Sequence, residues 1–361
     1  MANFFSTQNS LSHTNVATIT KEQNHENHQE SVDIILSELP SERGWVSDQI
    51  YQYKGTWYSS SVLQGLLVLQ QQQFEPKPNS VLLASHPKSG TTWLKALLFA
   101  ITNRLQHDDF STHPLLSSNP HELVPYLESY ALKHPTNPTP NTCLIQSHLA
   151  FNGLPESITG DNYKCKVVYV FRDAKDVLVS FWYFVQKLRR KDMPFISLAE
   201  AFDRFTKGYS PFGPFWDHVM GYYKASLEFP ERVLFLKYED LKKDPIFNAK
   251  RLAKFLGQPF SLEEESEGIV ERIIELCSFE KLRNLEVNKE GTYSGAFSLT
   301  IANNIFFRQG KVGDSKNHLS KEMIEVFDDI TKQKLVFNLM TTSVTPQKNG
   351  EVDDTDKNQS N

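Results

Sequence analysis

Cysteine is scarce in this chain of 361 residues, which carries only Cys143, Cys165 and Cys277. Three scattered thiols cannot form a disulfide framework or a zinc cluster, so we expect a reduced intracellular protein. Long apolar runs are also missing, because stretches such as Val81–Ala84 and Ala96–Ile101 are far shorter than the roughly 18–20 residues that a bilayer helix needs. The first ten residues lack the basic start and apolar core of a secretory signal. The sequence therefore predicts a cytoplasmic protein without a membrane partner.

An excess of positive charge is absent as well. Lys and Arg number 38 against 43 Asp and Glu, which gives a formal net charge of -5. Proteins that bind nucleic acid normally carry a basic excess, so this class of partner is disfavoured. No cluster of His, Cys, Asp and Glu has the spacing of metal ligands, and we expect no bound metal.

Both ends of the chain are polar. Residues 1–30 and 341–361 offer too little apolar surface to bury a core, so we expect disordered tails around a single domain of residues 31–340. Residues 1–20 carry seven Ser or Thr and no charged side chain, which also fits a plastid transit peptide. The arginines usual in such peptides are missing, and we favour the tail.

Short apolar runs alternate with helical patterns through the middle of the chain. Four of these runs have the continuous apolar character of strands buried on both faces: 81–85, 143–146, 166–171 and 232–236. Helices are predicted for 91–103, for 173–188 and for a segment that Pro245 opens and Gly257 closes. This alternation predicts an α/β fold with a central parallel β-sheet flanked by helices, whose binding sites lie at the carboxyl ends of the strands.

The loop after the first predicted strand, Ser85-His86-Pro87-Lys88-Ser89-Gly90-Thr91-Thr92-Trp93, has the composition of an anion cradle. Gly90 lets backbone N–H groups approach a ligand, Thr91 and Thr92 add hydroxyl donors, and the helix N-terminus adds partial positive charge. Lys88 adds a full charge. Because Lys88 precedes Gly90, the loop is not a Walker A motif, and a nucleoside triphosphate site without that motif is unusual. A Ser-Gly-Thr turn that only caps the helix is the alternative.

These motifs resemble those of the cytosolic sulfotransferases, most closely the plant soluble branch that includes flavonol and hydroxyjasmonate sulfotransferases. Pro87-Lys88-Ser89-Gly90-Thr91-Thr92-Trp93 is similar to the 5′-phosphosulfate loop of that family. The segments 169–180 and 307–314 resemble those that hold the 3′-phosphate, and shorter similarities occur at 44–45, 51–58, 235–240 and 276–280. The resemblance covers about residues 31–338 and implies the P-loop-like sulfotransferase fold.

The resemblance implies 3′-phosphoadenosine 5′-phosphosulfate (PAPS) as co-substrate, held in two cradles. Arg offers the bidentate fork that phosphate prefers, and the 3′ cradle contains two arginines. The residues implied for the nucleotide are Lys88, Ser89, Gly90, Thr91 and Thr92 at the 5′ end, Arg172, Ser180, Arg308, Gln309 and Gly310 at the 3′ end, Trp93 on the adenine, and Tyr238.

One of the eleven histidines, His148, follows the predicted strand 143–146 and matches the family's catalytic His. The resemblance implies a single in-line displacement. His148 takes the proton of the acceptor hydroxyl, while Lys88 and the loop amides stabilise the departing 3′,5′-bisphosphate (PAP). No metal takes part in this mechanism.

Four residues depart from the family pattern. Gln146 stands where many animal members have Lys, Gln309 where Lys is usual, Ser315 where Trp is usual, and Asp173 where Asn is usual. We expect these changes to weaken PAPS affinity without removing the base or the 5′ loop.

The sequence gives little information about the molecule that accepts the sulfuryl group. An aromatic set in a loop-prone stretch fits either a pocket for a flat hydroxylated ring or ordinary core packing: Phe151, Tyr209, Phe212, Phe215, Trp216 and His218. The resemblance implies a small hydroxylated plant metabolite, such as a flavonol, hydroxyjasmonate, a brassinosteroid or a desulfoglucosinolate.

Two other functions stay open: a non-catalytic binder of PAP or PAPS, and a nucleotide-dependent phosphotransferase that uses Lys88. We expect a monomer or a homodimer.

Overall fold

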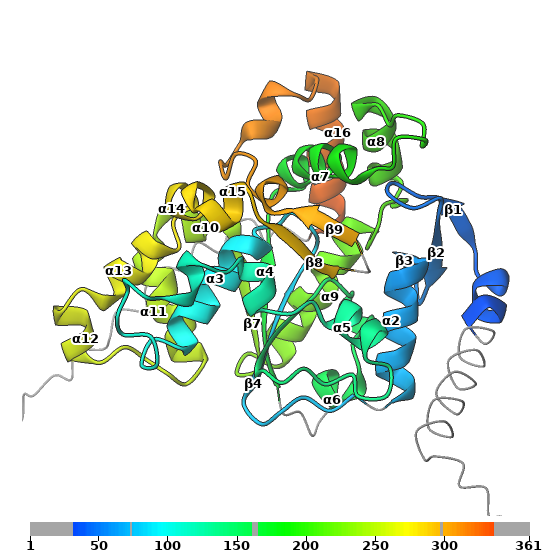
Figure 1. Cartoon of the computed structure of the whole chain (residues 1–361). Helices are drawn as coiled ribbons and strands as arrows, with labels where there is room; N and C mark the ends of the chain where they lie inside the picture. Colours follow the sequence, from blue (N-terminus) through cyan, green and yellow to red (C-terminus); the bar gives the residue numbers. More distant parts are fainter. Residues whose placement is uncertain (1–31, 73, 161–164, 297–298, 336–361) are drawn as a thin grey trace, which may run out of the picture.

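The computed structural model describes residues 32–72, 74–160, 165–296 and 299–335 (Figure 1). The tails predicted at 1–30 and 341–361 lie outside the described residues. That residues 31–340 form one domain stays a prediction.

A four-stranded parallel sheet forms the centre of the molecule, with the strand order β5-β4-β6-β7. Its strands are β4 (Ser80–Ser85), β5 (Leu144–Ser147), β6 (Cys165–Phe171) and β7 (Val233–Lys237). All six residues of β4 are buried, as expected of a strand covered on both faces. Each predicted strand is present within one residue at either end, and the predicted α/β class is confirmed.

Helices cover both faces of this sheet, because alternate residues of each strand point to opposite sides. Leu82, Tyr169 and Phe171 belong to one apolar cluster, and Leu83 and Val168 belong to the other. The first cluster is completed by α2 (Ser60–Gln71), α5 (Leu127–Lys133), α7 (Ala174–Leu188), α8 (Leu198–Thr206), α9 (Phe215–Glu228) and α16 (Lys321–Lys334). The second is completed by α3 (Thr91–Thr102), α11 (Pro245–Phe255), α13 (Ile269–Leu276) and α14 (Phe279–Asn284).

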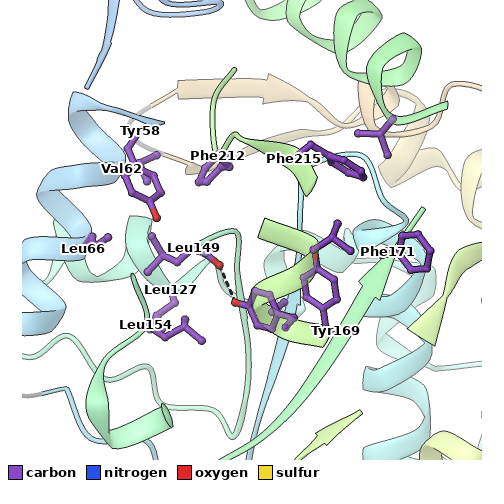
Figure 2. Close-up of a cluster of buried hydrophobic side chains, with 14 of the residues drawn as sticks. Tyr58, Val62, Leu66, Leu127, Leu149, Leu154, Tyr169, Phe171, Phe212 and Phe215 are labelled. Carbon is purple, nitrogen blue, oxygen red and sulfur yellow. Dashed lines mark hydrogen bonds between the residues drawn. The ribbon is translucent and has the colours of Figure 1, made fainter. Parts of the chain in front are cut away.

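Figure 2 shows part of the first cluster, where Val62 and Leu66 of α2 lie on one side and Tyr169 and Phe171 of β6 on the other. Leu149, which directly follows His148, packs between them and is fully buried. The backbone around His148 is therefore anchored in the core.

Smaller elements surround the central layers. They comprise an antiparallel sheet of β1 (Ser41–Arg43), β2 (Gln49–Tyr53) and β3 (Thr56–Ser59), a hairpin of β8 (Thr292–Ala296) and β9 (Leu299–Ala302), and the short helices α4 (Pro120–Leu123), α6 (Glu156–Thr159), α10 (Tyr238–Lys243), α12 (Leu262–Ser266) and α15 (Glu286–Lys289). Single turns of 3₁₀ helix occur at Pro114–Leu116, Phe151–Gly153, Asn303–Phe306 and Asp314–Asn317.

The helix ends follow local chemistry. Asp173 caps α7 with its side chain, which accepts a hydrogen bond from the Lys175 N–H at 2.9 Å. Pro245 occupies the first turn of α11, and Gly257 follows that helix with a left-handed φ of 78°. The stretch around Phe215 was expected to be loop-prone, and this expectation is wrong from Phe215 onward, since the long helix α9 begins there.

Candidate active site

One cavity of about 340 Å³ lies at the carboxyl edge of the central sheet. Residues that directly follow β5, β6 and β7 line it, together with the loop after β4 and the segment 306–310. All the predicted site residues except Ser89 contribute to the lining: Lys88, Gly90, Thr91, Thr92, Trp93, His148, Arg172, Ser180, Tyr238, Arg308, Gln309 and Gly310. The parallel sheet thus gathers residues from distant parts of the sequence at one edge.

The loop between β4 and α3 has an unusual backbone. Lys88 has a φ of 70° and Gly90 a φ of 111°, both in the region that favours glycine. A Cβ atom on Gly90 would lie 2.6 Å from the ring of Tyr238, so only glycine fits. The Ser89 hydroxyl is buried without a hydrogen-bond partner among the described residues. A tight turn of this kind exposes backbone N–H groups to an anion.

The ammonium of Lys88 lies 4.1 Å from the centre of the Phe184 ring. Burial and the nearby charges of Arg308, Arg172 and Lys187 lower the pKa of Lys88 to about 7. Several positive groups therefore converge on one cavity, and an anion bound there would relieve their mutual repulsion.

Lys88 forms one cationic group of the cavity, and Arg172 and Arg308 form a second. Asp176, in the first turn of α7, holds Arg172 of this second group. Its Oδ2 atom lies 3.0 Å from Nη2 of Arg172 and accepts from the Gly313 N–H at 2.8 Å, while its Oδ1 accepts from the Ser315 N–H at 2.9 Å. Although burial raises the pKa of Asp176, the charge of Arg172 and these N–H groups hold it below its ordinary value. Asp176 thus fastens the segment 310–315 to the end of β6.

Asp314 of the segment 310–315 also holds Arg308 in place. Nη1 of Arg308 lies 2.6 Å from Oδ2 of Asp314, and the guanidinium lies 5.1 Å from the ring centre of Tyr183. Ser315, which departs from the family pattern, is buried and bound to Asp176 through its backbone. The carboxylate of Asp173, another departure, is engaged in capping α7 and lies 3.5 Å from the ammonium of Lys175.

Tyr238 contacts both the loop after β4 and the residues at the 3′ end of the cavity. Its ring is 4.8 Å from the guanidinium carbon of Arg172 and 5.8 Å from the Trp93 ring at an angle of 82°. Its hydroxyl donates to the carbonyl oxygen of Gly310 at 3.2 Å. A Cβ atom on Gly310 would in turn lie 2.5 Å from the Phe279 ring. The loop after β4 and the segment around Gly310 are therefore packed against one side chain.

Hydrogen bonds hold His148 at its ring and at both of its backbone groups. Its Nδ1 lies 2.7 Å from the carbonyl oxygen of Ser85, which can only accept, so Nδ1 carries the proton and Nε2 is left as the basic nitrogen. The His148 N–H donates to Oε1 of Glu128 at 3.1 Å, and its carbonyl accepts from Nε2 of His218 at 3.0 Å. Burial, opposed in part by the bond to Ser85, lowers the pKa of His148 to about 3. The imidazole is therefore neutral at physiological pH, and its Nε2 carries a lone pair.

Sequence analysis missed the carboxylate that supports this histidine. Glu128 of α5 is fully buried, and its Oε1 accepts from the Ser147 hydroxyl at 2.6 Å and from the Leu149 N–H at 3.1 Å, besides His148. Burial raises the pKa of Glu128 to about 7, although these donors oppose the shift. Nothing in a single sequence distinguishes Glu128 from a surface glutamate of an amphipathic helix.

Other cavity residues were also missed as site residues, although some lie in motifs noted above. They are Pro87, His121, Phe184, Lys242, Pro245, Ile274, Cys277, Ser278, Phe279, Leu282, Phe306 and Phe307. Most of these residues are apolar, and the ring of Phe184 lies against the ammonium of Lys88.

The aromatic set predicted for an acceptor pocket is absent from the lining of this cavity. Phe215, Trp216 and His218 are buried in the core of the first cluster, in which His218 bonds Tyr169, so the packing alternative holds for them. Phe212 is the member whose ring lies 5.4 Å from that of His148. Gln146 is also buried and does not reach the cavity.

Metal-ligand clusters and membrane-spanning helices are both absent from the part of the chain that the structure describes. Within it, no three His, Cys, Asp or Glu side chains are grouped so that they could hold a metal ion. No helix in the same residues has the length and apolar character needed to cross a bilayer.

Comparison with known proteins identifies similar sequences. Residues 78–337 match the sulfotransferase domain family. The chain is 50% identical over 291 residues to flavonol 4′-sulfotransferase of Flaveria chlorifolia, covering 79% of this chain and 88% of that protein. It is 43% identical over 320 residues to cytosolic sulfotransferase 17 of Arabidopsis thaliana, covering 87% and 89%.

Solved structures show the same architecture. A putative steroid sulphotransferase of Arabidopsis thaliana has a TM-score of 0.65 and 36% identity, over 84% of this chain and 92% of that one. A mouse sulfotransferase in complex with PAP has a TM-score of 0.60 at 23% identity, over 81% and 95%, and shares the fold.

Proposed function

Because the chain belongs to the sulfotransferase family and transfers a sulfuryl group from PAPS to a small metabolite, we propose that the cavity at the sheet edge binds PAPS. The observation that carries this proposal is that one cavity combines two cationic groups with a histidine whose Nε2 is unprotonated.

The residues present fit a ligand with two anionic ends. Lys88 has an aromatic ring rather than a carboxylate against its ammonium, and the Ser89 hydroxyl and the Nε atoms of Arg172 and Arg308 are buried without a hydrogen-bond partner in the described structure. Buried donors of this kind need an acceptor, which phosphate oxygens supply. Lys88 to Thr92 would take the 5′-phosphosulfate, and Arg172, Ser180, Arg308, Gln309 and Gly310 would take the 3′-phosphate.

Aromatic side chains complete the nucleotide site. Trp93 would stack on the adenine, since it lines the cavity beside Tyr238 and carries the ammonium of Lys242 at 5.4 Å from its ring centre. Tyr238 would contact the nucleotide while keeping both cationic groups in place.

His148 would act as the general base and Lys88 as the group that stabilises the leaving oxygen. PAPS supplies the sulfuryl group that is transferred. Nε2 of His148 accepts the acceptor proton, and the bond from Nδ1 to the Ser85 carbonyl stabilises the imidazolium that forms. The ammonium of Lys88 is aimed at the charge that develops at the 5′ end. No metal is required for this division of roles.

The acceptor we propose is a small hydroxylated plant metabolite of the flavonol type. The 50% identity to a flavonol sulfotransferase supports it, as does the ring of Phe212 near His148. We also propose that the protein acts in the cytosol, as the names of its Arabidopsis relatives state for them, as a monomer or homodimer without nucleic-acid or membrane partners.

The first test is the thermal stability of the purified protein with PAP, compared with ATP and magnesium. We expect PAP to raise Tm and ATP with magnesium to have little effect. Turnover is then measured with PAPS and a panel of flavonols and hydroxyjasmonate, with and without EDTA. No stabilisation by PAP would contradict the proposed site.

The variant His148→Asn tests the base, because an Asn amide can keep the hydrogen bond to the Ser85 carbonyl but cannot accept a proton. We expect turnover to fall by at least about a hundredfold with unchanged PAP binding. Equal activity would remove His148 from the mechanism. PAP binding by the wild-type protein without turnover of any acceptor would instead favour the non-catalytic alternative.

A further inference from the structure

A lysine outside the cavity is connected to it through a histidine. Lys95 of α3 is fully buried and follows Thr92 by three residues, on the same face of the helix. Its Nζ donates to the Val124 carbonyl at 2.9 Å and lies 3.1 Å from Nδ1 of His121. Burial of an ammonium costs several kcal/mol, so such a group in the second apolar cluster calls for a role.

His121 is held rigidly between this lysine and the cavity. It lies in α4, whose start is fixed by a capping box of Asn119 and Glu122, and Asn119 donates to Asn288 at 2.7 Å. The imidazole stacks on Phe306 with ring centres 4.0 Å apart and planes at 24°. Its Nε2 lies 3.0 Å from the Thr92 hydroxyl.

Lys95 determines the hydrogen-bond directions along the series Lys95, His121 and Thr92. The ammonium of Lys95 has three N–H donors and no acceptor, so Nδ1 of His121 accepts from it and the ring proton is on Nε2. A neutral amine also carries a lone pair that accepts, so it is the ammonium form of Lys95 that determines this tautomer. Nε2–H then donates to the Thr92 oxygen, and the hydroxyl proton of Thr92 is free to point elsewhere. Thr92 lines the cavity.

We propose that Lys95 is a positioning residue for sulfuryl transfer, which acts through His121 to make the Thr92 hydroxyl a hydrogen-bond donor to the anion bound at the loop after β4. This inference rests on the proposed function of that loop. A hydroxyl oriented in advance stabilises developing charge without reorganisation at the moment of reaction. Without Lys95, His121 can adopt the other tautomer, in which Nε2 accepts and the Thr92 proton turns away from the cavity.

The experiment is a double-mutant cycle on kcat and on KM for PAPS. Lys95→Met keeps the length of the side chain and removes the donor, and Thr92→Val removes the hydroxyl. In the wild-type background we expect Lys95→Met to lower kcat on the order of tenfold to a hundredfold, with a smaller change in KM. In the Thr92→Val background the same substitution should change kcat less than twofold, because its target is already gone.

Lys166→Met is the matched control. Lys166 also donates to a backbone carbonyl, that of Phe255, and contacts the Phe255 ring, but it lies near the start of β6, at the opposite end of the strand from the cavity. We expect kcat near that of the wild type. An equal fall in kcat from Lys95→Met in both backgrounds would overturn the inference and leave Lys95 a structural residue.

Two substitutions at His121 provide the test if Lys95→Met does not fold. An Asn side chain places an acceptor near the position of Nδ1 and cannot reach Thr92, whereas a Gln side chain places a donor near the position of Nε2. We expect His121→Asn to lower kcat at least tenfold and His121→Gln to recover most of the activity. Equal kcat values in these two variants would overturn the inference. Failure of the wild-type protein to turn over PAPS would instead contradict the proposed function itself.

Discussion

At the scale of single residues, the cavity is shaped by positions where a side chain is missing. Gly90 and Gly310 each leave space for an aromatic ring, that of Tyr238 and that of Phe279 respectively. Both glycines have positive φ values, so conformation and space select the same residue. The tight loop and the aromatic wall therefore depend on each other.

Gly90→Ala should damage the nucleotide site more than an ordinary glycine substitution does. The new methyl group would meet the Tyr238 ring at 2.6 Å, in addition to a conformational cost of about 1–2 kcal/mol. We expect the Kd for PAP, measured by calorimetry, to rise at least about tenfold. Gly55→Ala is the control, because Gly55 has a φ of 81° but no atom within 4 Å of the added Cβ. If both variants bind PAP equally well, the contact with Tyr238 has no role.

Affinity for PAP should depend on pH through Lys88. With a pKa of about 7 in the free protein, its ammonium is present below pH 7 and is lost above it, whereas a bound anion favours the charged form. The Kd should therefore rise between pH 7 and pH 9, by up to about tenfold per pH unit. Calorimetry at pH 6, 7, 8 and 9 measures this.

Lys88→Arg separates this effect from ionisation of the ligand, since a guanidinium stays charged over the whole range. Its Kd should vary little with pH. A parallel rise in the variant and the wild type would contradict the assignment to Lys88.

Residues with a chemical role at the site were predictable where they lie in the loop that follows a strand. Lys88, His148 and Arg172 stand at the carboxyl ends of strands whose apolar runs are legible, and all three line the cavity. Lys95 and Glu128 were not predictable, because charged residues of helices are usually exposed. Their burial depends on contacts with segments far away in the sequence.

At the scale of secondary-structure elements, the N-terminal turn of α7 fastens the segment 310–315 to the sheet. Asp176 is the connection, and its carboxylate is engaged on both oxygens. This segment supplies Gly310 to the cavity and holds Arg308 through Asp314, so its position determines the 3′ end of the proposed nucleotide site.

Asp176→Asn should therefore lower both stability and PAP affinity. Removal of one charge from a buried ion pair costs on the order of 3–5 kcal/mol, because it leaves Arg172 without its partner. Urea denaturation at pH 7 measures the free energy of unfolding, and calorimetry measures binding.

Asp203→Asn is the matched control for this change. Asp203 pairs with Lys207 at 2.9 Å, four residues along α8, but both side chains are more than half exposed. A change of no more than about 0.5 kcal/mol is expected there. If the two substitutions had equal effects, Asp176 would not be the fastening residue.

Some of the elements that sequence analysis missed are short or polar. The strand β1 has three exposed residues, and α4 has four residues that begin with Pro120. Such segments carry too few apolar positions to show a period, and tertiary contacts decide their conformation. The four buried strands and the helices α3, α7 and α11 were predictable because each shows a continuous or periodic apolar pattern. The long helices α2, α9 and α16 were not predicted.

At the scale of the whole molecule, the cavity joins parts of the chain that are more than 200 residues apart, such as Lys88 and Arg308. Binding of a ligand that contacts both should stabilise the folded state as a unit. At a concentration a hundred times Kd, the expected stabilisation is about 2.7 kcal/mol.

PAP should raise Tm more than adenosine 5′-monophosphate, which lacks the 3′-phosphate. In Arg308→Ala this difference should shrink, while the smaller effect of the monophosphate persists. Thermal unfolding at equal ligand concentrations tests both statements. Equal loss of both effects in Arg308→Ala would show that Arg308 does not distinguish the 3′ end.

The fold class was predictable as a whole because strand and helix patterns alternate, and a parallel sheet is the arrangement that satisfies them. Which aromatic residues line the cavity and which belong to the core was harder to predict. The aromatic set at Phe215 and Trp216 illustrates this, since both core and pocket select the same side chains, and the structure places these two in the core.

The positive φ of Lys88 has a consequence for how position 88 should vary under selection. Gly and Asn adopt this backbone conformation more easily than Lys does. A library selected only for folding should therefore enrich Gly and Asn there, whereas one selected for turnover should retain Lys. The difference between the two enrichments would measure how much folding stability this enzyme gives up to hold one charge beside its substrate.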